Sequence, residues 1–246
     1  MRSNIKKNIA LIFAGGTGSR MGTVTVPKQF LISGGKPIIA HTIDHFEKHP
    51  MIDGIVVVCI ESGIDRLKSI TNENNYSKIV SIVPGGTSGQ ESIFLGLQEI
   101  NNVCHIDDFS VVLIHDGVRP LINAETITKC IESVRKNGCT ATVAPAVETI
   151  IEESKGKVAR VVDRSCCKLA RAPQGFIFQQ IYKAHKQALN EGKQNCFIDS
   201  VSLMANYGYD IYTIDGPTEN IKITTRQDYF AFKGYMDYKE MGQFWD

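Results

Sequence analysis

Residues 8–22 read NIALIFAGGTGSRMG and join a short apolar run to a glycine-rich loop. The run Asn8–Phe13 predicts a buried strand, and apolar residues at helical spacing predict a helix around Pro37–Lys48. Four glycines let backbone N–H groups approach phosphate oxygens closely, although a flexible turn is the simpler interpretation. The stretch therefore predicts a β-loop-α unit with a candidate phosphate site in its loop.

The same alternation of apolar runs and helical patterns continues along the chain. Strands are predicted at Gly54–Ile60, Ile79–Val83, Val111–Ile114, Thr140–Pro145 and Asp210–Ile214, and helices at Gly63–Thr71, Gly89–Ile100, Ala124–Asn137, Phe178–Glu191, Asp199–Asn206 and from Arg226 onward. Continuous apolar strands between helices are typical of a parallel sheet that helices cover on both faces. The expected fold class is therefore α/β, with a mostly parallel wound sheet.

A polar stretch from Glu148 to Lys168 interrupts this alternation and fits poorly into a wound sheet. Within it, Lys157–Asp163 is predicted to form one strand of a hairpin. No internal repeat or low-complexity linker divides the chain. We therefore expect a single domain over residues 1–246, with a protruding β-arm at about 148–172.

The 246 residues include 27 Lys and Arg against 26 Asp and Glu, so the net charge is +1. This balance gives no overall field to recruit nucleic acid or an anionic membrane. The apolar run Ile9–Ala14 is too short for a signal-peptide core, and no window reaches the length of a transmembrane helix. Seven cysteines without a C-x-x-C pair favour reduced thiols over disulfides or zinc. These features predict a cytoplasmic protein without a nucleic-acid or membrane partner.

Two cations, Arg20 and Lys28, accompany the glycines of the first loop. The loop does not match the dinucleotide fingerprint, because Met21 occupies the place of its last glycine, and the G-K-[ST] of a Walker loop is absent. Cations eight positions apart suit the neutralisation of a triphosphate and a departing pyrophosphate. The loop is therefore interpreted as a phosphate-binding segment of another type.

A second candidate segment, HDGVRP at residues 115–120, directly follows a predicted strand. Ligands of open α/β sheets bind beyond the carboxyl ends of the strands, so Asp116 is a candidate ligand for Mg²⁺ beside nucleotide phosphates. The alternative is an ion pair between Asp116 and Arg119 at the end of the strand. For His115, a hydrogen-bonded structural role is favoured.

A third candidate segment, PTENIKITT at residues 217–225, also follows a strand. Lys222 stands between apolar residues, so in an extended chain it faces away from them, toward an acceptor phosphate. Glu219 or Asn220 is a candidate to complete the shell of a metal at Asp116. Thr225 is a candidate cap of the last helix.

Together these segments resemble the family of cytidylyltransferases that includes methylerythritol-phosphate cytidylyltransferase and ribitol-5-phosphate cytidylyltransferase. AGGTGSRMG with PKQF, HDGVRP, APQGF and ENIKITT occur in the family's order between about Asn8 and Tyr229. The resemblance implies a Rossmann-like three-layer nucleotidyltransferase fold and a homodimer joined by the β-arm. It also implies Mg²⁺-dependent transfer of CMP from CTP to a small polyol phosphate, which gives a CDP-polyol and pyrophosphate.

The resemblance further implies roles for individual residues. The implied catalytic residues are Arg20, Lys28 and Lys222, and the implied nucleotide ligands are Ala14, Gly15, Gly16, Gly18, Gly86, Ser92, Asp116 and Gly117. The implied acceptor ligands are Arg119, Thr149, Arg164 and Lys222, with Arg164 supplied by the arm of the second subunit, and the implied metal ligands are Asp116 and Glu219.

Several positions depart from the family's pattern. Gly89 stands where the family usually has an arginine, and Ala172 and Ile198 stand where threonines are expected near the acceptor phosphate. Because a site built on hydrogen bonds loses discrimination without them, these changes argue against the strict methylerythritol-phosphate enzyme. Val118 resembles the ribitol-phosphate branch, so the expected acceptor is ribitol 5-phosphate or a similar polyol phosphate. The alternative acceptor is 2-C-methyl-D-erythritol 4-phosphate.

Two other classes of protein are compatible with a wound sheet. A nicotinamide-dependent oxidoreductase is disfavoured by the failed dinucleotide fingerprint. A degenerate nucleotide binder without catalytic activity is motivated by the departures at Gly89, Ala172 and Ile198.

Overall fold

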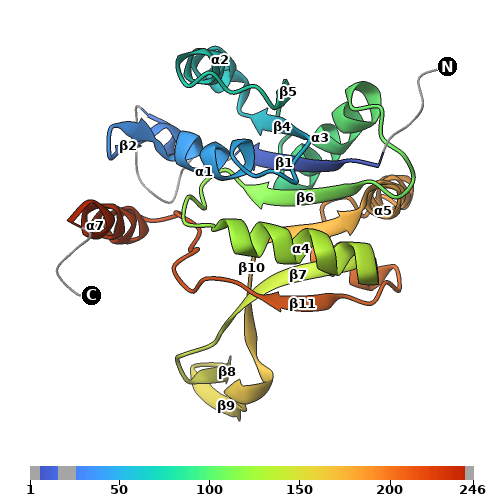
Figure 1. Ribbon diagram of the computed structural model, residues 1–246. Helices are drawn as coiled ribbons and strands as arrows, with labels where there is room; N and C mark the ends of the chain where they lie inside the picture. Colours follow the sequence, from blue (N-terminus) through green and yellow to red (C-terminus); the bar gives the residue numbers. More distant parts are fainter. Residues whose placement is uncertain (1–5, 16–25, 242–246) are drawn as a thin grey trace.

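The computed structural model describes residues 6–15 and 26–241, arranged around one large sheet with helices on both faces (Figure 1). The strands are β1 Asn8–Ala14, β2 Ile32–Ser33, β3 Lys36–Pro37, β4 Gly54–Cys59, β5 Ile79–Pro84, β6 Val111–Asp116, β7 Cys139–Pro145, β8 Ile150–Ser154, β9 Lys157–Val162, β10 Lys168–Ile177 and β11 Tyr212–Asp215. The helices are α1 Ile38–Glu47, α2 Ile64–Glu73, α3 Gly89–Val103, α4 Ala124–Asn137, α5 Phe178–Asn190, α6 Ser200–Asn206 and α7 Arg226–Met241, and short 3-10 turns are η2 Lys28–Phe30, η3 Glu61–Gly63 and η4 Arg164–Cys166.

The large sheet has seven strands in the order β11-β7-β10-β6-β1-β4-β5. Strand β10 runs antiparallel to both of its neighbours, β6 and β7, whereas the other adjacent strands are parallel. The expected α/β class with a mostly parallel wound sheet is confirmed. The carboxyl ends of β1 and β6 meet at one edge, because Phe13 is in register with Asp116.

Alternate residues of each central strand enter two separate cores. On β1, Ala10 and Ile12 pack with apolar residues of α1, α2 and α4, whereas Ile9 and Leu11 pack with those of α3, α5 and α6. This period of two follows from the pleat of the strand. Because both faces are covered, the strands are apolar throughout, and the polar residues at their ends remain available for a site.

Strand β10 is the strand of the large sheet that the sequence did not predict. Its residues include Pro173 and Gly175, which are uncommon inside central strands. Pro173 is accommodated where the register with β7 shifts between Ala170 and Gln174, and its carbonyl accepts a hydrogen bond of 2.7 Å from the Thr142 hydroxyl. Pairing with β6 and β7, and not local propensity, therefore determines this strand.

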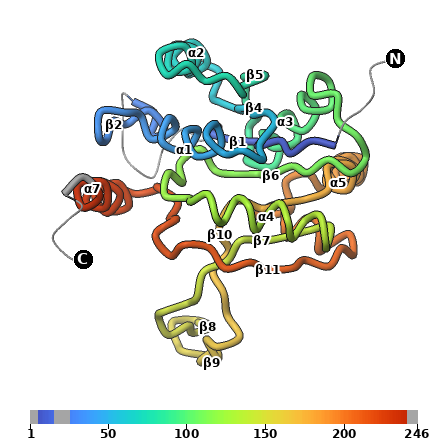
Figure 2. The backbone as a smooth tube through the Cα atoms, in the orientation of Figure 1, coloured from blue at the N-terminus to red at the C-terminus, as the bar shows by residue number. Residues whose placement is uncertain are grey.

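The predicted arm is an antiparallel hairpin of β8 and β9 that extends away from the sheet (Figure 2). Strands β7 and β10 lead into and out of it, and their pairing continues up to Pro145 and Lys168. Ile151 lies directly opposite Val161 in the hairpin, so both side chains lie on one face. The arm therefore carries an apolar face outside the main cores.

Helix α7 closes the described chain against the start of α1. Phe232 is buried beside Ile38 and Val118, and Thr225 caps the helix because its hydroxyl accepts from the Asp228 N–H at 3.2 Å. All seven cysteines are free thiols. Over the ranges 6–15 and 26–241, none of the helices has both the length and the apolar character needed to cross a bilayer.

Candidate active site

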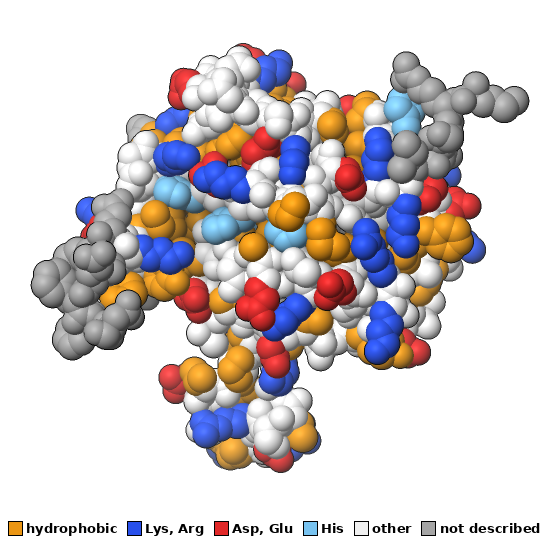
Figure 3. All heavy atoms as spheres, viewed as in Figure 1, with side chains coloured by type: hydrophobic (Ala, Val, Ile, Leu, Met, Phe, Trp, Pro, Cys, Tyr) orange, Lys and Arg blue, Asp and Glu red, His pale blue; other side chains and the backbone are white. Residues whose placement is uncertain are grey.

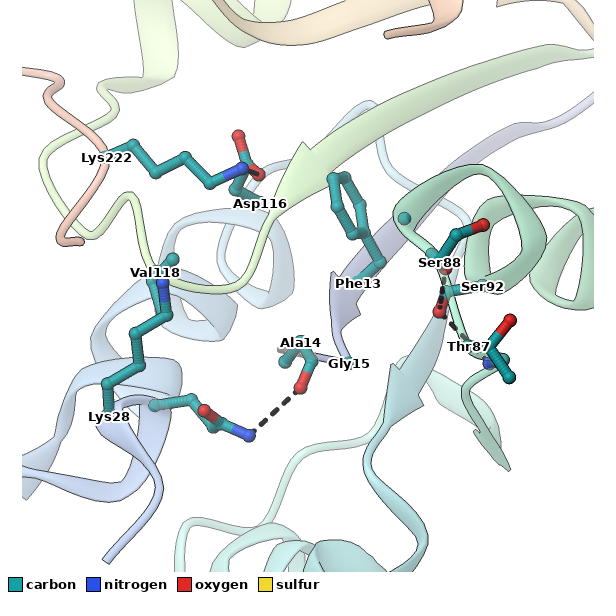
Figure 4. A pocket seen from close by; sticks show the side chains of 13 residues that line it. Phe13, Ala14, Gly15, Lys28, Thr87, Ser88, Ser92, Asp116, Val118 and Lys222 are labelled. Atoms are coloured by element: carbon teal, nitrogen blue, oxygen red, sulfur yellow. Dashed lines mark hydrogen bonds and ion pairs between the residues drawn. The ribbon is translucent and has the colours of Figure 1, made fainter. Parts of the chain in front are cut away.

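A cavity of about 440 Å³ opens where the carboxyl ends of β1 and β6 face the amino end of α3 (Figure 4). Its walls are formed by Phe13, Ala14, Gly15, Lys28, Gln29, Gly86, Thr87, Ser88, Gly89, Ser92, Asp116, Val118 and Lys222. This position is the one at which open α/β sheets bind their ligands. The first N–H groups of α3 also lack partners within the helix, and such helix ends favour anions.

Ser92 fixes the shape of this cavity. Its hydroxyl donates to the Ser88 carbonyl at 2.8 Å and accepts from the Gly86 N–H at 3.1 Å. A β-carbon on Gly15 or Gly85 would lie 2.9 or 3.0 Å from the same hydroxyl oxygen, closer than side chains normally pack, which favours glycine at both positions. Ser92 therefore holds two glycine-containing segments side by side, which brings their backbones close to any bound nucleotide.

Asp116 binds two cations at the floor of the cavity. One carboxylate oxygen is 2.6 Å from Lys222 Nζ and the other is 2.7 Å from Arg119 Nε. Burial alone would raise the pKa of Asp116, but the charges of Lys222 and Arg119 outweigh it and lower this pKa to about 2. Asp116 is therefore ionised at neutral pH, and it holds Lys222, whose side chain is 40% exposed, at the cavity.

His115 precedes Asp116 but faces away from the cavity. It is fully buried, packs against Phe46, and its Nε2 lies 3.1 Å from the Arg119 carbonyl oxygen. Burial lowers the pKa of His115 to about 4, so the ring is neutral near pH 7. The expected structural role of His115 is confirmed, and the site has no general base at this position.

A second cavity of about 330 Å³ adjoins the first and shares Phe13, Gly89, Asp116 and Lys222 with it. Its other walls are formed by Gln90, Ile93, Ile114, Arg119, Ala170, Arg171, Ala172, Gln174, Ile198, Asp199 and Ser200. Ala172 and Ile198, where the resemblance expects threonines near an acceptor, both line this cavity. Asp116 and Lys222 thus stand at the junction of two compartments.

Most of the described residues that the sequence singled out lie at these cavities. Ala14, Gly15, Lys28, Gly86, Ser92, Asp116 and Lys222 line the first cavity, and Arg119 lines the second. Gly16, Gly18 and Arg20 lie outside the described residues. The motifs therefore converge on one edge of the sheet, as the sequence predicted.

Four of the described residues for which the resemblance implies a role do not line either cavity. Gly117 is buried, and a β-carbon there would lie 2.9 Å from that of Ala14, so its smallness serves packing. The Glu219 carboxylate accepts from the Tyr235 hydroxyl at 3.3 Å instead of lining either cavity. Thr149 and Arg164 belong to the arm, where Arg164 donates to the Val147 carbonyl at 2.7 Å. Within one chain, these two do not join the site.

Phe13 and Arg171 are among the wall residues that were not anticipated from the sequence. The Phe13 ring lies 5.7 Å from Lys222 Nζ, in the range of a cation–π contact, and it lines both cavities. Arg171 lies on β10, the strand that was not predicted. In the sequence, a role for Arg171 at the site is indicated only by its place directly before the APQGF motif.

Comparisons with known proteins agree with this geometry. The family model described as 2-C-methyl-D-erythritol 4-phosphate cytidylyltransferase matches residues 8–237. The chain is 48% identical to the ribitol-5-phosphate cytidylyltransferase of Vibrio parahaemolyticus, over 95% of this chain and 97% of that protein. It is 37% identical to the 2-C-methyl-D-erythritol 4-phosphate cytidylyltransferase of Clostridium acetobutylicum, over 91% of this chain and 95% of that protein.

Among solved structures, the fold resembles that of 4-diphosphocytidyl-2C-methyl-D-erythritol synthase from Anaerococcus prevotii. The TM-score is 0.79 at 28% identity, and the match covers 94% of this chain and 96% of that one. The expected family and its nucleotidyltransferase fold are therefore confirmed. The sequence, the fold and the paired cavities place this chain in the 2-C-methyl-D-erythritol 4-phosphate cytidylyltransferase family, to which it belongs over almost its whole length.

Proposed function

We propose that this chain transfers CMP from CTP to ribitol 5-phosphate, giving CDP-ribitol and pyrophosphate. The observation that carries this proposal is the junction of two cavities at Asp116 and Lys222. One compartment accommodates the nucleotide and the other the acceptor, with a cation between them. The 48% identity to a ribitol-5-phosphate cytidylyltransferase over nearly the full length of both chains supports the choice of acceptor.

In the proposed reaction, a phosphate oxygen of the acceptor forms a bond to the α-phosphorus of CTP. The bond from that phosphorus to the bridging oxygen of the β-phosphate breaks, and pyrophosphate leaves on the opposite side. The acceptor phosphate is already ionised near neutral pH, so no general base is needed. Lys28 and Lys222 neutralise charge on the two polyanions and orient them, which is the main requirement of phosphoryl transfer.

We propose that the reaction depends on Mg²⁺. No group of three or more His, Cys, Asp or Glu side chains suited to a metal occurs in residues 6–15 and 26–241. Mg²⁺ beside nucleotides commonly takes one carboxylate and completes its shell with phosphates and water. Asp116 is an ionised carboxylate at the cavity, and its oxygens keep lone pairs beyond those that accept from Lys222 and Arg119. This donor set fits the ion, and bound Mg²⁺ would supply neutralisation of phosphate charge.

A second acceptor, 2-C-methyl-D-erythritol 4-phosphate, is the alternative within the same family, because the family model carries that name. The nicotinamide-dependent oxidoreductase considered from the sequence is excluded by the family to which the chain belongs. A nucleotide binder without catalytic activity would bind CTP but release no pyrophosphate with any acceptor.

Wild-type protein is expected to release pyrophosphate from CTP and Mg²⁺ when ribitol 5-phosphate is added, and to do so less efficiently with 2-C-methyl-D-erythritol 4-phosphate. A coupled pyrophosphate assay with both acceptors in parallel measures kcat/KM for each, and chelation of Mg²⁺ by EDTA is expected to stop release. A higher kcat/KM with the methylerythritol acceptor would transfer the assignment to that alternative. CTP binding without release on a panel of tetritol and pentitol phosphates would indicate a non-catalytic binder.

We also infer that the chain works in the cytoplasm as a homodimer joined through its arm. The seven free cysteines support a reducing compartment. Ile151 and Val161 are 49% and 62% exposed, which supports an apolar contact through the arm. Figure 3 shows the arm as a separate protrusion from the main body. In such a dimer, Thr149 and Arg164 of one subunit would contact the site of the other.

The dimer predicts a mass in solution of twice the 27.2 kDa of the chain. The substitution Val161→Asp is expected to give the mass of a single chain, because it places a charge on the apolar face of the arm. Light scattering coupled to size-exclusion chromatography measures both. Phe109→Asp is the matched control, since Phe109 is 69% exposed but lies outside the arm. A monomeric wild type, or a dimeric Val161→Asp variant, would contradict the arm-mediated dimer.

A further inference from the structure

Arg171 lies at the irregular part of β10, beside the carboxyl end of β6. The register with β7 shifts between Ala170 and Gln174, and the pairing with β6 starts only at Gln174. Arg171 therefore pairs with neither β6 nor β7, and it lines the second cavity. Its guanidinium forms no hydrogen bond or ion pair with any residue in the described part of the chain, and its Nε is shielded from solvent without a partner. A shielded cationic donor of this kind is costly unless a ligand completes it.

The charges around Arg171 leave an excess of positive charge. Burial lowers the pKa of Arg171, and the neighbouring charge of Arg119 lowers it further, so the two guanidinium groups repel each other. Lys222 adds a third cation to the same cavity. Of the two carboxylates in its walls, Asp116 is already shared by Arg119 and Lys222.

The other carboxylate, Asp199, accepts a hydrogen bond on each of its oxygens. One of its oxygens accepts from Gln174 Nε2 at 2.8 Å, and the other accepts from the Ser202 N–H at 2.8 Å as the cap of α6. Neither oxygen forms an ion pair with Arg171. Among the residues that the structure describes, the walls of this cavity carry more cationic than anionic side chains, which suits a bound anion.

Two further polar atoms point to a ligand with hydroxyl groups. Gln90 Oε1 and Ser200 Oγ are buried without partners, and both residues line the same cavity as Arg171. Most buried side-chain polar atoms in folded proteins have a partner. A ligand that combines an anionic group with hydroxyls would complete all three side chains after small rotations.

We propose that Arg171 is an acceptor-binding residue whose guanidinium pairs with the phosphate of the polyol phosphate, beside Lys222 at the junction of the cavities. This inference rests on the proposed function and deepens it. The acceptor phosphate is then held by the same chain that holds CTP, in addition to any contact from the arm of a second subunit. Arg171 would position the attacking phosphate without contributing to nucleotide binding.

The test compares Arg171→Gln, which removes the charge, with Arg171→Lys, which keeps it. Arg171→Gln is expected to raise KM for ribitol 5-phosphate by about ten- to a hundredfold, because a charge-assisted contact to a phosphate is lost. KM for CTP is expected to stay within about twofold of the wild type, and Arg171→Lys is expected to recover part of the acceptor affinity. The control is Arg135→Gln, because Arg135 contacts Asn8 at the opposite end of β1.

A binding measurement separates this inference from the proposed function. Inorganic phosphate is titrated calorimetrically into protein saturated with a non-hydrolysable CTP analogue, so that only the acceptor compartment is open. Wild type and Arg135→Gln are expected to bind phosphate, and Arg171→Gln to bind it at least about tenfold more weakly. This readout needs no turnover, so it decides the role of Arg171 even if no acceptor in the panel is used. Equal phosphate affinity in wild type and Arg171→Gln, with an unchanged melting temperature, would overturn the inference.

Discussion

Replacement of Lys222 by alanine is expected to lower kcat for pyrophosphate release by about a hundredfold or more, which is typical when a group that stabilises transition-state charge is removed. Lys222 lines both cavities, where it is held 2.6 Å from Asp116 and close to the Phe13 ring. It therefore faces the position at which the acceptor phosphate and the α-phosphate of CTP meet. Steady-state kinetics with ribitol 5-phosphate and CTP measure the loss.

The fold is expected to survive this substitution, because the Lys222 side chain is 40% exposed and Asp116 keeps its contact with Arg119. Lys222→Met, which retains the apolar stem without the charge, is expected to be as inactive as the alanine variant. Lys233→Ala is the matched control, since Lys233 is an exposed lysine of α7 outside both cavities. Near wild-type kcat in Lys222→Ala would remove Lys222 from the catalytic assignment.

Local signals made much of the fold predictable. Helix α4 has the bounds that were predicted for it, and both of its ends carry local signals. The Asn123 side chain accepts from the Thr126 N–H at 2.9 Å at its start, and Gly138 follows its end at a φ of 89°. Continuous apolar runs predicted the buried parallel strands, because strands that helices cover on both faces are apolar throughout. Strand β10 gave no such signal, since Pro173 and Gly175 disfavour a strand and only its partners β6 and β7 stabilise it.

The site was predictable where side chains project from the ends of regular strands. Asp116 directly ends β6, so its place at the cavity followed from the topology. Glu219 stands in an irregular segment, and such a segment has no periodicity from which to infer the direction of a side chain. It contacts Tyr235 of α7 instead. Arg171 was not predicted, because the role of a single arginine can be inferred only when its strand is known and its guanidinium is seen to lack a partner.

Asp116→Asn is expected to reduce both activity and stability. An asparagine side chain has one acceptor oxygen where Asp116 has two, and its amide donor would face the N–H groups of Arg119 or Lys222. Arg119 is 9% exposed, so its charge would be left largely uncompensated in the interior. Loss of one partner of a buried ion pair costs about 3–5 kcal/mol. Urea unfolding at pH 7 measures this cost, and pyrophosphate release measures the accompanying loss of orientation at Lys222.

The pH dependence of stability gives an independent check on the role of Asp116. The folded protein holds the pKa of Asp116 at about 2, below the ordinary value of 3.8, because Lys222 and Arg119 favour the ionised form over the effect of burial. A depressed carboxyl pKa contributes stability that is complete above about pH 5 and is lost progressively as the pH falls through about 4 toward 2. The stability difference between wild type and Asp116→Asn is therefore expected to shrink over that window. Asp215→Asn is the control, because the exposed pair of Asp215 with Lys168 at 3.3 Å contributes about 1 kcal/mol or less. If the difference between wild type and Asp116→Asn stayed constant between pH 5 and 2, the two cations would not be what keeps Asp116 ionised.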